Sequence, residues 1–107
     1  MGKAETTTSK LEAINIAKRY KELLARHLEF SELVLFGSYS NDLARPDSDI
    51  DIAVVVEYSD PNYFAQVPLL WKLRREIDLR IEPILIDKSD DKLAFLDEVK
   101  KHGIVIK

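Results

Sequence analysis

The feature that most constrains the fold of this chain is an apolar run near its middle, Asp49–Val56, whose only charges are at its start. From Ile52 onward every residue of the run is aliphatic, and its last residues are consecutive valines. β-branched residues favour extended backbone, and a strand without polar side chains must be covered on both of its faces. Together with the helical patterns on either side of it, the run predicts a mixed α/β (α+β) fold, in which a small mixed sheet packs against helices.

The segments that flank this run carry further helix and strand patterns. A helix is predicted to begin at Ser9, because Ser9 and Glu12 have the spacing of a capping box and an apolar stripe follows. Leu33–Phe36 predicts a short buried strand. Ile81–Ile86 predicts a third strand, in which Pro83 removes one ladder donor and therefore favours either the edge of the sheet or a bulge. Further elements are expected to start at Asp60–Pro61, Ser89 and Ile104.

The length and composition indicate one domain and exclude several classes of site. Residues 1–107 are expected to form a single domain with an apolar core, and residues 1–8 a disordered N-terminal tail. No apolar run approaches the roughly 20 residues of a membrane span, so a cytoplasmic protein is expected. The absence of cysteine excludes disulfides, zinc–thiolate sites and thiol catalysis. The net charge of −3 argues against direct binding along a nucleic-acid backbone, which needs a basic surface.

The pattern that carries chemistry is the pair Gly37-Ser38, followed by ten residues and then Asp49-Ile50-Asp51. In a strand, residues two apart share a face and lie roughly 6.6 Å apart, so Asp49 and Asp51 are expected to point to the same side. Two like charges beside an apolar strand are unfavourable unless cations neutralise them. Mg²⁺ suits carboxylate oxygens and shares its other positions with phosphates, so the two acids predict a magnesium site.

The Gly37-Ser38 pair has a complementary interpretation. A glycine at the end of a strand lets the backbone approach a ligand closely, because no Cβ intervenes. A helix that begins at Ser38 would direct its free N–H groups and the hydroxyl toward an anion. Taken singly, both features have plainer explanations: an ordinary strand-to-helix turn, and solvated acids at a strand end. Their combination is what favours a joint site for metal and triphosphate.

The pattern Gly37-Ser38-x₁₀-Asp49-x-Asp51 resembles the motif of the polymerase-β-type nucleotidyltransferase superfamily. The string over residues 44–51, Ala-Arg-Pro-Asp-Ser-Asp-Ile-Asp, resembles its minimal nucleotidyltransferase branch. The resemblance covers essentially the whole chain and implies the polymerase-β-like nucleotidyltransferase fold. It implies that Gly37 and Ser38 contact the β/γ-phosphates of an NTP, and that Asp49 and Asp51 bind two Mg²⁺ ions. A third carboxylate on the neighbouring strand is implied to bind metal and to activate the attacking hydroxyl.

Three acids near the third predicted strand are candidates for that third carboxylate. Glu82 fits best, because it lies inside the strand between apolar neighbours, where an unpaired charge is hard to explain. Asp78 precedes the strand and Asp87 follows it, and both could be solvated end residues. An ion pair of Glu82 with Arg80 or Arg74 is the plainer alternative.

Arg45 and Ser48, both within the motif region, are further candidates for binding nucleotide. Many members of the family carry Arg and Gly after the Gly-Ser pair, where this chain has Asn41 and Asp42. An acid near a triphosphate repels it, so Asp42 either weakens NTP binding or points away from the nucleotide.

The resemblance implies an enzyme that transfers AMP from ATP to a hydroxyl acceptor. In the minimal branch the implied acceptor is a tyrosine of a cognate HEPN toxin, which would make the chain the antitoxin of a type VII toxin–antitoxin pair. A HEPN-family toxin is therefore the expected partner, and a homodimer or hetero-oligomer would supply the acceptor surface that so short a chain lacks. Two alternatives remain open: a catalytically weak antitoxin that acts by binding alone, and a transferase for a small molecule.

Overall fold

Strand β2 (Ile50–Val56) lies inside a four-stranded sheet with the order β3-β2-β1-β4. The structure is a computed structural model, and it describes residues 2–39, 48–57, 63–88 and 93–107. Every residue of β2 except Asp51 is buried, as predicted for a strand that is covered on both faces. The predicted mixed fold, with a small mixed sheet against helices, is confirmed.

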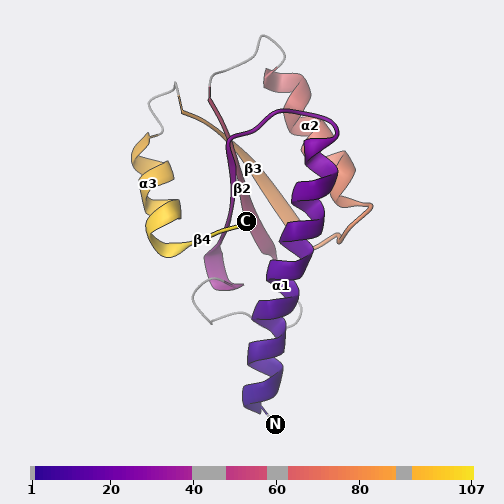
Figure 1. Cartoon of the computed structure of the whole chain (residues 1–107), viewed down its shortest axis with the longest axis vertical. Coiled ribbons are helices and arrows are strands. Elements are labelled where there is room, and N and C mark those ends of the chain that lie inside the picture. The colour runs from indigo at the N-terminus through magenta and orange to yellow at the C-terminus, as the bar shows by residue number, and fades with distance from the viewer. Residues whose placement is uncertain (1, 40–47, 58–62, 89–92) are drawn as a thin grey trace.

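Helices and strands follow one another in the predicted order (Figure 1). The strands are β1 (Glu32–Phe36), β2, β3 (Ile81–Asp87) and β4 (Ile104–Val105). The helices are α1 (Gly2–Ala25), the short 3₁₀ turn η1 (Gly37–Tyr39), α2 (Tyr63–Arg74) and α3 (Leu93–His102). The helix starts predicted at Asp60–Pro61 and at Ser89 lie outside the described residues.

The sheet contains both parallel and antiparallel pairs. β2 pairs antiparallel with β1 and parallel with β3, and β4 adds antiparallel to the other side of β1. The parallel pair requires a crossover, and α2 lies in the connection that provides it. β3 is an edge strand, which is one of the two positions that Pro83 predicts.

Helices cover both faces of the sheet (Figure 1). Buried side chains of α1 and α2 form one core with alternate strand residues such as Leu33 and Ile52. On the opposite face, Leu96 of α3 belongs to a second core that includes Ala53. Even-numbered residues of β2 therefore face α1 and α2, and odd-numbered residues face α3.

Helix α1 is longer at its N-terminus than predicted. It begins at Gly2 rather than at Ser9, so residues 2–8 are helical where the sequence predicts a disordered tail. No glycine or proline lies between Gly2 and Gly37 to interrupt the helix. Its first turns extend past the end of the sheet (Figure 1). Neither α1 nor any other helix in the described ranges is long and apolar enough to cross a membrane.

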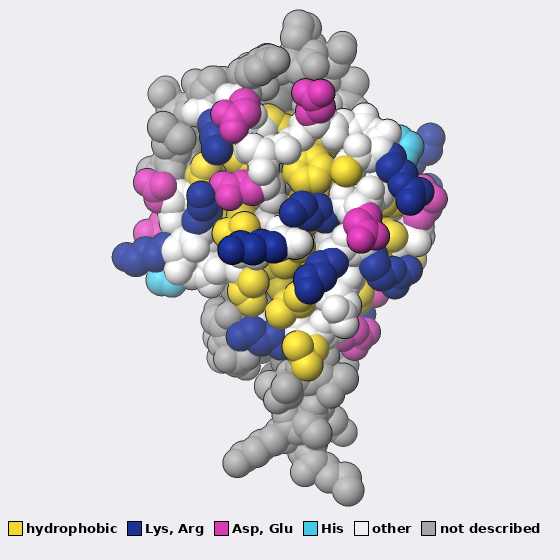
Figure 2. Space-filling view, viewed as in Figure 1, with side chains coloured by type: hydrophobic (Ala, Val, Ile, Leu, Met, Phe, Trp, Pro, Cys, Tyr) yellow, Lys and Arg dark blue, Asp and Glu magenta, His cyan; other side chains and the backbone are white. Residues whose placement is uncertain are grey.

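Charged side chains are unevenly distributed over the surface. Figure 2 shows Lys and Arg side chains gathered over the middle of one face, although the net charge of the chain is −3. One basic side chain also has a structural role: Nζ of Lys21 donates to the carbonyl oxygen of Ile106 at 2.8 Å and so links α1 to the end of the chain.

Ile52→Ala is expected to lower the free energy of unfolding by about 2–5 kcal/mol, because it leaves a cavity beneath α1 and α2. Urea denaturation followed by circular dichroism measures the change. Leu79→Ala is the control: Leu79 is 65% exposed, so its truncation should change the free energy of unfolding by less than about 0.5 kcal/mol. Equal losses in the two variants would contradict the placement of Ile52 in the core.

Candidate active site

Asp51 and Glu82 lie opposite each other on neighbouring strands. The parallel register of β2 and β3 pairs Asp51 with Glu82, and the antiparallel register of β1 and β2 pairs Asp51 with Phe36. By the alternation along each strand, both acids are on the face that α3 covers further along the sheet. Asp49 is exposed directly before β2. The structure thus brings together three of the acids that the sequence singles out.

The surroundings of Asp51 disfavour its negative charge. Burial raises the pKa of this carboxyl group to about 6, and the negative charges of Glu82 and Asp49 add to the increase. The three carboxylates therefore interact electrostatically as one cluster. A cation bound among them would reverse the effect, since it favours the ionised carboxylate.

Gly37 brings the end of β1 into contact with Asp51. Its φ of 76° lies in the left-handed region, which glycine adopts without strain. A Cβ at this position would overlap Oδ2 of Asp51 and would lie 3.1 Å from Cγ of the same side chain. The missing Cβ thus permits a close approach between the η1 turn and the carboxylate cluster.

Two other predicted nucleotide-binding residues, Ser38 and Ser48, lie on the segments beside this cluster. Ser38 is the middle residue of the η1 turn. Ser48 is partly buried and directly precedes Asp49. Arg45 lies outside the described residues, together with residues 41–42. The roles of Ser38, Ser48 and Arg45 stay predictions.

Of the three candidates for the third carboxylate, only Glu82 is in register with Asp51. Asp78 accepts hydrogen bonds from the Arg80 guanidinium, at 3.0 Å from Nε and 2.9 Å from Nη2, and these bonds lower the pKa of Asp78. Asp87 is at the opposite end of β3 and is buried. The geometry therefore favours Glu82 as the acid that completes the cluster.

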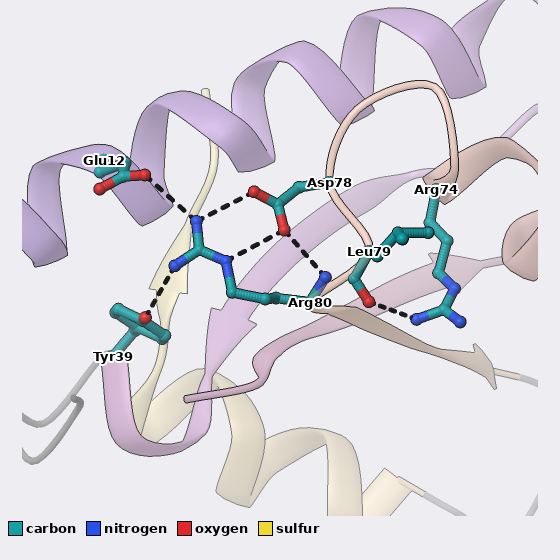
Figure 3. Close-up of polar contacts among 6 residues, drawn as sticks. All are labelled: Glu12, Tyr39, Arg74, Asp78, Leu79 and Arg80. Carbon is teal, nitrogen blue, oxygen red and sulfur yellow. Dashed lines mark hydrogen bonds and ion pairs between the residues drawn. The ribbon is translucent and has the colours of Figure 1, made fainter. Parts of the chain in front are cut away.

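Arg74 and Arg80 have structural partners that the sequence pattern did not indicate (Figure 3). Arg80 binds Asp78, and Nη1 of Arg74 donates to the carbonyl oxygen of Leu79 at 2.6 Å. Within the described part of the chain, neither arginine forms an ion pair with Glu82, so the plainer explanation of Glu82 is not observed. The sequence does contain a pattern that could have indicated the observed ion pair of Arg80 with Asp78. The two opposite charges lie two residues apart, just before a strand.

The carboxylate cluster offers the oxygen donors that suit Mg²⁺. No group of three or more His, Cys, Asp or Glu side chains in the described ranges is arranged to hold an ion as it stands. However, Mg²⁺ usually needs only one or two carboxylates besides phosphate and water ligands, and the exposed Glu82 has room to change rotamer. The raised pKa of Asp51 also indicates negative charge that a cation would stabilise. The residues therefore fit a divalent ion that binds together with a phosphate group.

Comparison with known proteins identifies the class of this fold. A crystal structure described as a "putative nucleotidyltransferase from Sulfolobus solfataricus" superposes with a TM-score of 0.71 and 22% sequence identity, over 94% of this chain and 85% of that chain. Residues 18–107 match the family described as polymerase beta, nucleotidyltransferase, and the chain belongs to this family. The predicted fold family and enzyme class, a nucleotidyltransferase, are thereby confirmed.

Two further comparisons concern a protein-modifying enzyme and a toxin–antitoxin. "Putative protein adenylyltransferase MJ0141" of Methanocaldococcus jannaschii is 27% identical over 100 residues, which are 90% of this chain and 100% of that protein. A chain in a crystal structure of a toxin–antitoxin with AMP-PNP has 25% identity and a TM-score of 0.56, over 87% of this chain and 73% of that chain.

Gly37→Ala is expected to lower the free energy of unfolding by about 1–3 kcal/mol, because alanine adopts a positive φ only with strain and its Cβ overlaps the Asp51 carboxylate. In an Asp51→Ala background the loss should be smaller, since only the backbone strain is left. Urea denaturation of the four proteins in this double-mutant cycle measures both values. An equal loss in both backgrounds would show that the two residues do not contact each other.

The stability of the metal-free protein is expected to depend on the charge of Asp51. Its pKa rises from 3.8 to about 6 on folding, so the folded state holds this proton more tightly than the unfolded chain does. Ionisation of Asp51 therefore lowers the free energy of unfolding. This loss is absent below about pH 4 and complete above about pH 6. Asp51→Asn should raise the free energy of unfolding at pH 8 and change it little near pH 4, as urea denaturation in EDTA would measure. A variant that is less stable than the parent at pH 8 would contradict this expectation.

Proposed function

We propose that this nucleotidyltransferase is a Mg²⁺-dependent protein adenylyltransferase, which transfers AMP from ATP to a hydroxyl group of a partner protein. One observation supports the proposal above all: the η1 turn at Gly37 adjoins Asp51, and Asp51 is in register with Glu82. The phosphates of a nucleotide bound by the turn would therefore lie next to the carboxylates.

The η1 turn is proposed to bind the triphosphate. Gly37 and Ser38 offer backbone amides to the β- and γ-phosphates, because the left-handed glycine turns the chain sharply at the end of β1. Arg45 and Ser48, which precede β2 in the chain, are proposed to add further contacts to the nucleotide. Binding at this turn orients the α-phosphate toward the acids at the start of β2.

The carboxylates are proposed to hold the ions and to move the proton. Asp49, Asp51 and Glu82 bind two Mg²⁺ ions, which when bound neutralise phosphate charge and align the triphosphate. Glu82, which is exposed and lies on the edge strand, accepts the proton of the attacking hydroxyl. The acceptor oxygen bonds to the α-phosphorus while the bond to the bridging oxygen breaks, and pyrophosphate leaves.

The acceptor is proposed to be a tyrosine of a HEPN-family toxin, so that the chain acts as the antitoxin of a type VII pair. The similarity to a protein named as an adenylyltransferase of proteins, and to a toxin–antitoxin structure that contains AMP-PNP, supports a protein acceptor and an adenine nucleotide. The acceptor surface is proposed to come from the partner or from a second copy of the chain.

Incubation with Mg²⁺, ATP labelled on its α-phosphate and the product of the neighbouring gene, which is expected to be a HEPN protein, tests the proposal. Label should appear on a tyrosine of the HEPN protein, and EDTA should prevent it. Asp49→Asn with Asp51→Asn should abolish transfer. Glu82→Gln should lower the rate constant of transfer about 10²–10⁴-fold, since it removes the proposed general base.

Glu57→Gln is the matched control for these carboxylate variants. Glu57 directly follows β2, at the end of the strand away from the cluster, and pairs there with Lys88 at 3.3 Å, so the variant should transfer AMP at the parental rate. Tight binding of the HEPN protein without label transfer would contradict the enzymatic proposal and favour an antitoxin that acts by contact. Transfer only to a small hydroxylated molecule would contradict the protein acceptor.

A further inference from the structure

Arg80 joins three separate elements beside the candidate active site (Figure 3). Its guanidinium forms two hydrogen bonds with Asp78, at 3.0 Å from Nε and 2.9 Å from Nη2. Nη2 also pairs with Oε1 of Glu12 in α1 at 3.1 Å, and Nη1 donates to the hydroxyl of Tyr39 in η1 at 3.4 Å. A single side chain thus connects α1, η1 and the start of β3.

The Tyr39 contact and the backbone of Arg80 lie next to residues of the candidate site. Tyr39 directly follows Ser38 and is buried, so its ring position and the η1 turn are coupled. The backbone oxygen of Arg80 accepts a hydrogen bond from the N–H of Ile50 at 2.8 Å, between the two aspartates of β2. Arg80 is also two residues before Glu82 in the chain. Arg80 therefore contacts η1 through its side chain and β2 through its backbone, and both of these elements carry residues of the candidate site.

The Arg80 network and the carboxylates occupy opposite faces of the sheet. Tyr39 belongs to the core that α1 and α2 form with the sheet, and Glu12 is a residue of α1. Asp51 and Glu82 are on the α3 face. Arg80 therefore does not reach a nucleotide at the carboxylates while it keeps these partners, and any influence on the reaction has to act through the η1 turn and the strands.

We propose that Arg80 is a positioning residue for nucleotidyl transfer, which holds the η1 turn at a fixed place relative to the acids at the start of β2 and β3. This inference rests on the proposed role of the turn in binding the triphosphate. Small displacements of binding groups are costly for transfer, because the reaction depends mainly on alignment and charge stabilisation.

The chemistry of the side chain explains why an arginine is required. A planar guanidinium directs its donors in fixed directions, so it binds both oxygens of Asp78 and still reaches Glu12 and Tyr39. A lysine would keep the charge but would have a single nitrogen, which cannot hold these three partners in the same geometry. The Asp78 carboxylate is in turn held by the backbone N–H of Arg80 at 2.8 Å.

The first test measures ATP affinity in a double-mutant cycle. Arg80→Lys should weaken binding of ATP about tenfold, the equivalent of roughly one lost charged hydrogen bond, with circular dichroism showing that the variant is folded. Tyr39→Phe should weaken it several-fold, and the double variant should bind no more weakly than Arg80→Lys alone, because both changes break the same connection. Additive losses would contradict the proposal.

A second measurement requires no nucleotide and separates positioning from general loss of stability. In the free protein, amide hydrogen exchange at Gly37 and Ser38 should be faster in Arg80→Lys than in the parent chain. Leu96→Ala is the control, since it removes buried contacts of α3 and lowers stability without touching the Arg80 network. Leu96→Ala should leave the affinity for ATP unchanged. Amide exchange at Gly37 and Ser38 should keep the same ratio to global exchange as in the parent chain.

The two measurements distinguish failure of this inference from failure of the proposed function. Unchanged exchange in the turn of Arg80→Lys, or a loss of ATP affinity in Leu96→Ala as large as in Arg80→Lys, would overturn the positioning role. A parent chain that binds no ATP, but whose turn exchanges faster in Arg80→Lys, would contradict the proposed nucleotide site while confirming that Arg80 holds the turn.

Discussion

Strand β2 has to meet two requirements that oppose each other. Its middle is buried on both faces between helices, and its first residues carry negative charge. A carboxylate inside the core would be strongly unfavourable, so the charged end needs access to water or cations. The chain separates the two along the strand: the acids precede the residues that α3 covers. The pKa of Asp51, raised to about 6 mainly by burial, reflects how close the two environments lie. The candidate active site is placed at this transition.

The register of the sheet turns the end of β2 into a site. Pairing with β1 brings the turn at Gly37 to Asp51, and pairing with β3 brings Glu82 to the other side. Because side chains alternate, a shift of one residue would move Glu82 to the face of α1 and α2. That face holds the Arg80 network instead. The sheet thus separates the acids proposed to bind Mg²⁺ from the Arg80 network proposed to hold the η1 turn in place.

Membership of the polymerase beta nucleotidyltransferase family gives these positions a chemical meaning that the fold alone does not carry. Nucleotidyl transfer needs alignment and charge stabilisation more than it needs covalent chemistry by the protein. A small sheet with a few acids and a glycine turn can therefore suffice. A protein acceptor would add its own surface to such a site.

The sequence by itself determined the order of the elements and the burial of β2, because each follows from local patterns such as the aliphatic run. Pro83, which has no N–H, restricted β3 to an edge or a bulge, and the order of the sheet shows that β3 is an edge strand. It also contained the family motif. It did not decide which acid adjoins Asp51, since Asp78, Glu82 and Asp87 are all close to the third strand along the chain, and only the parallel register brings Glu82 there. Nor did it reveal the partners of Arg80. They belong to α1, η1 and the turn before β3, and they meet only when α1 packs on the finished sheet.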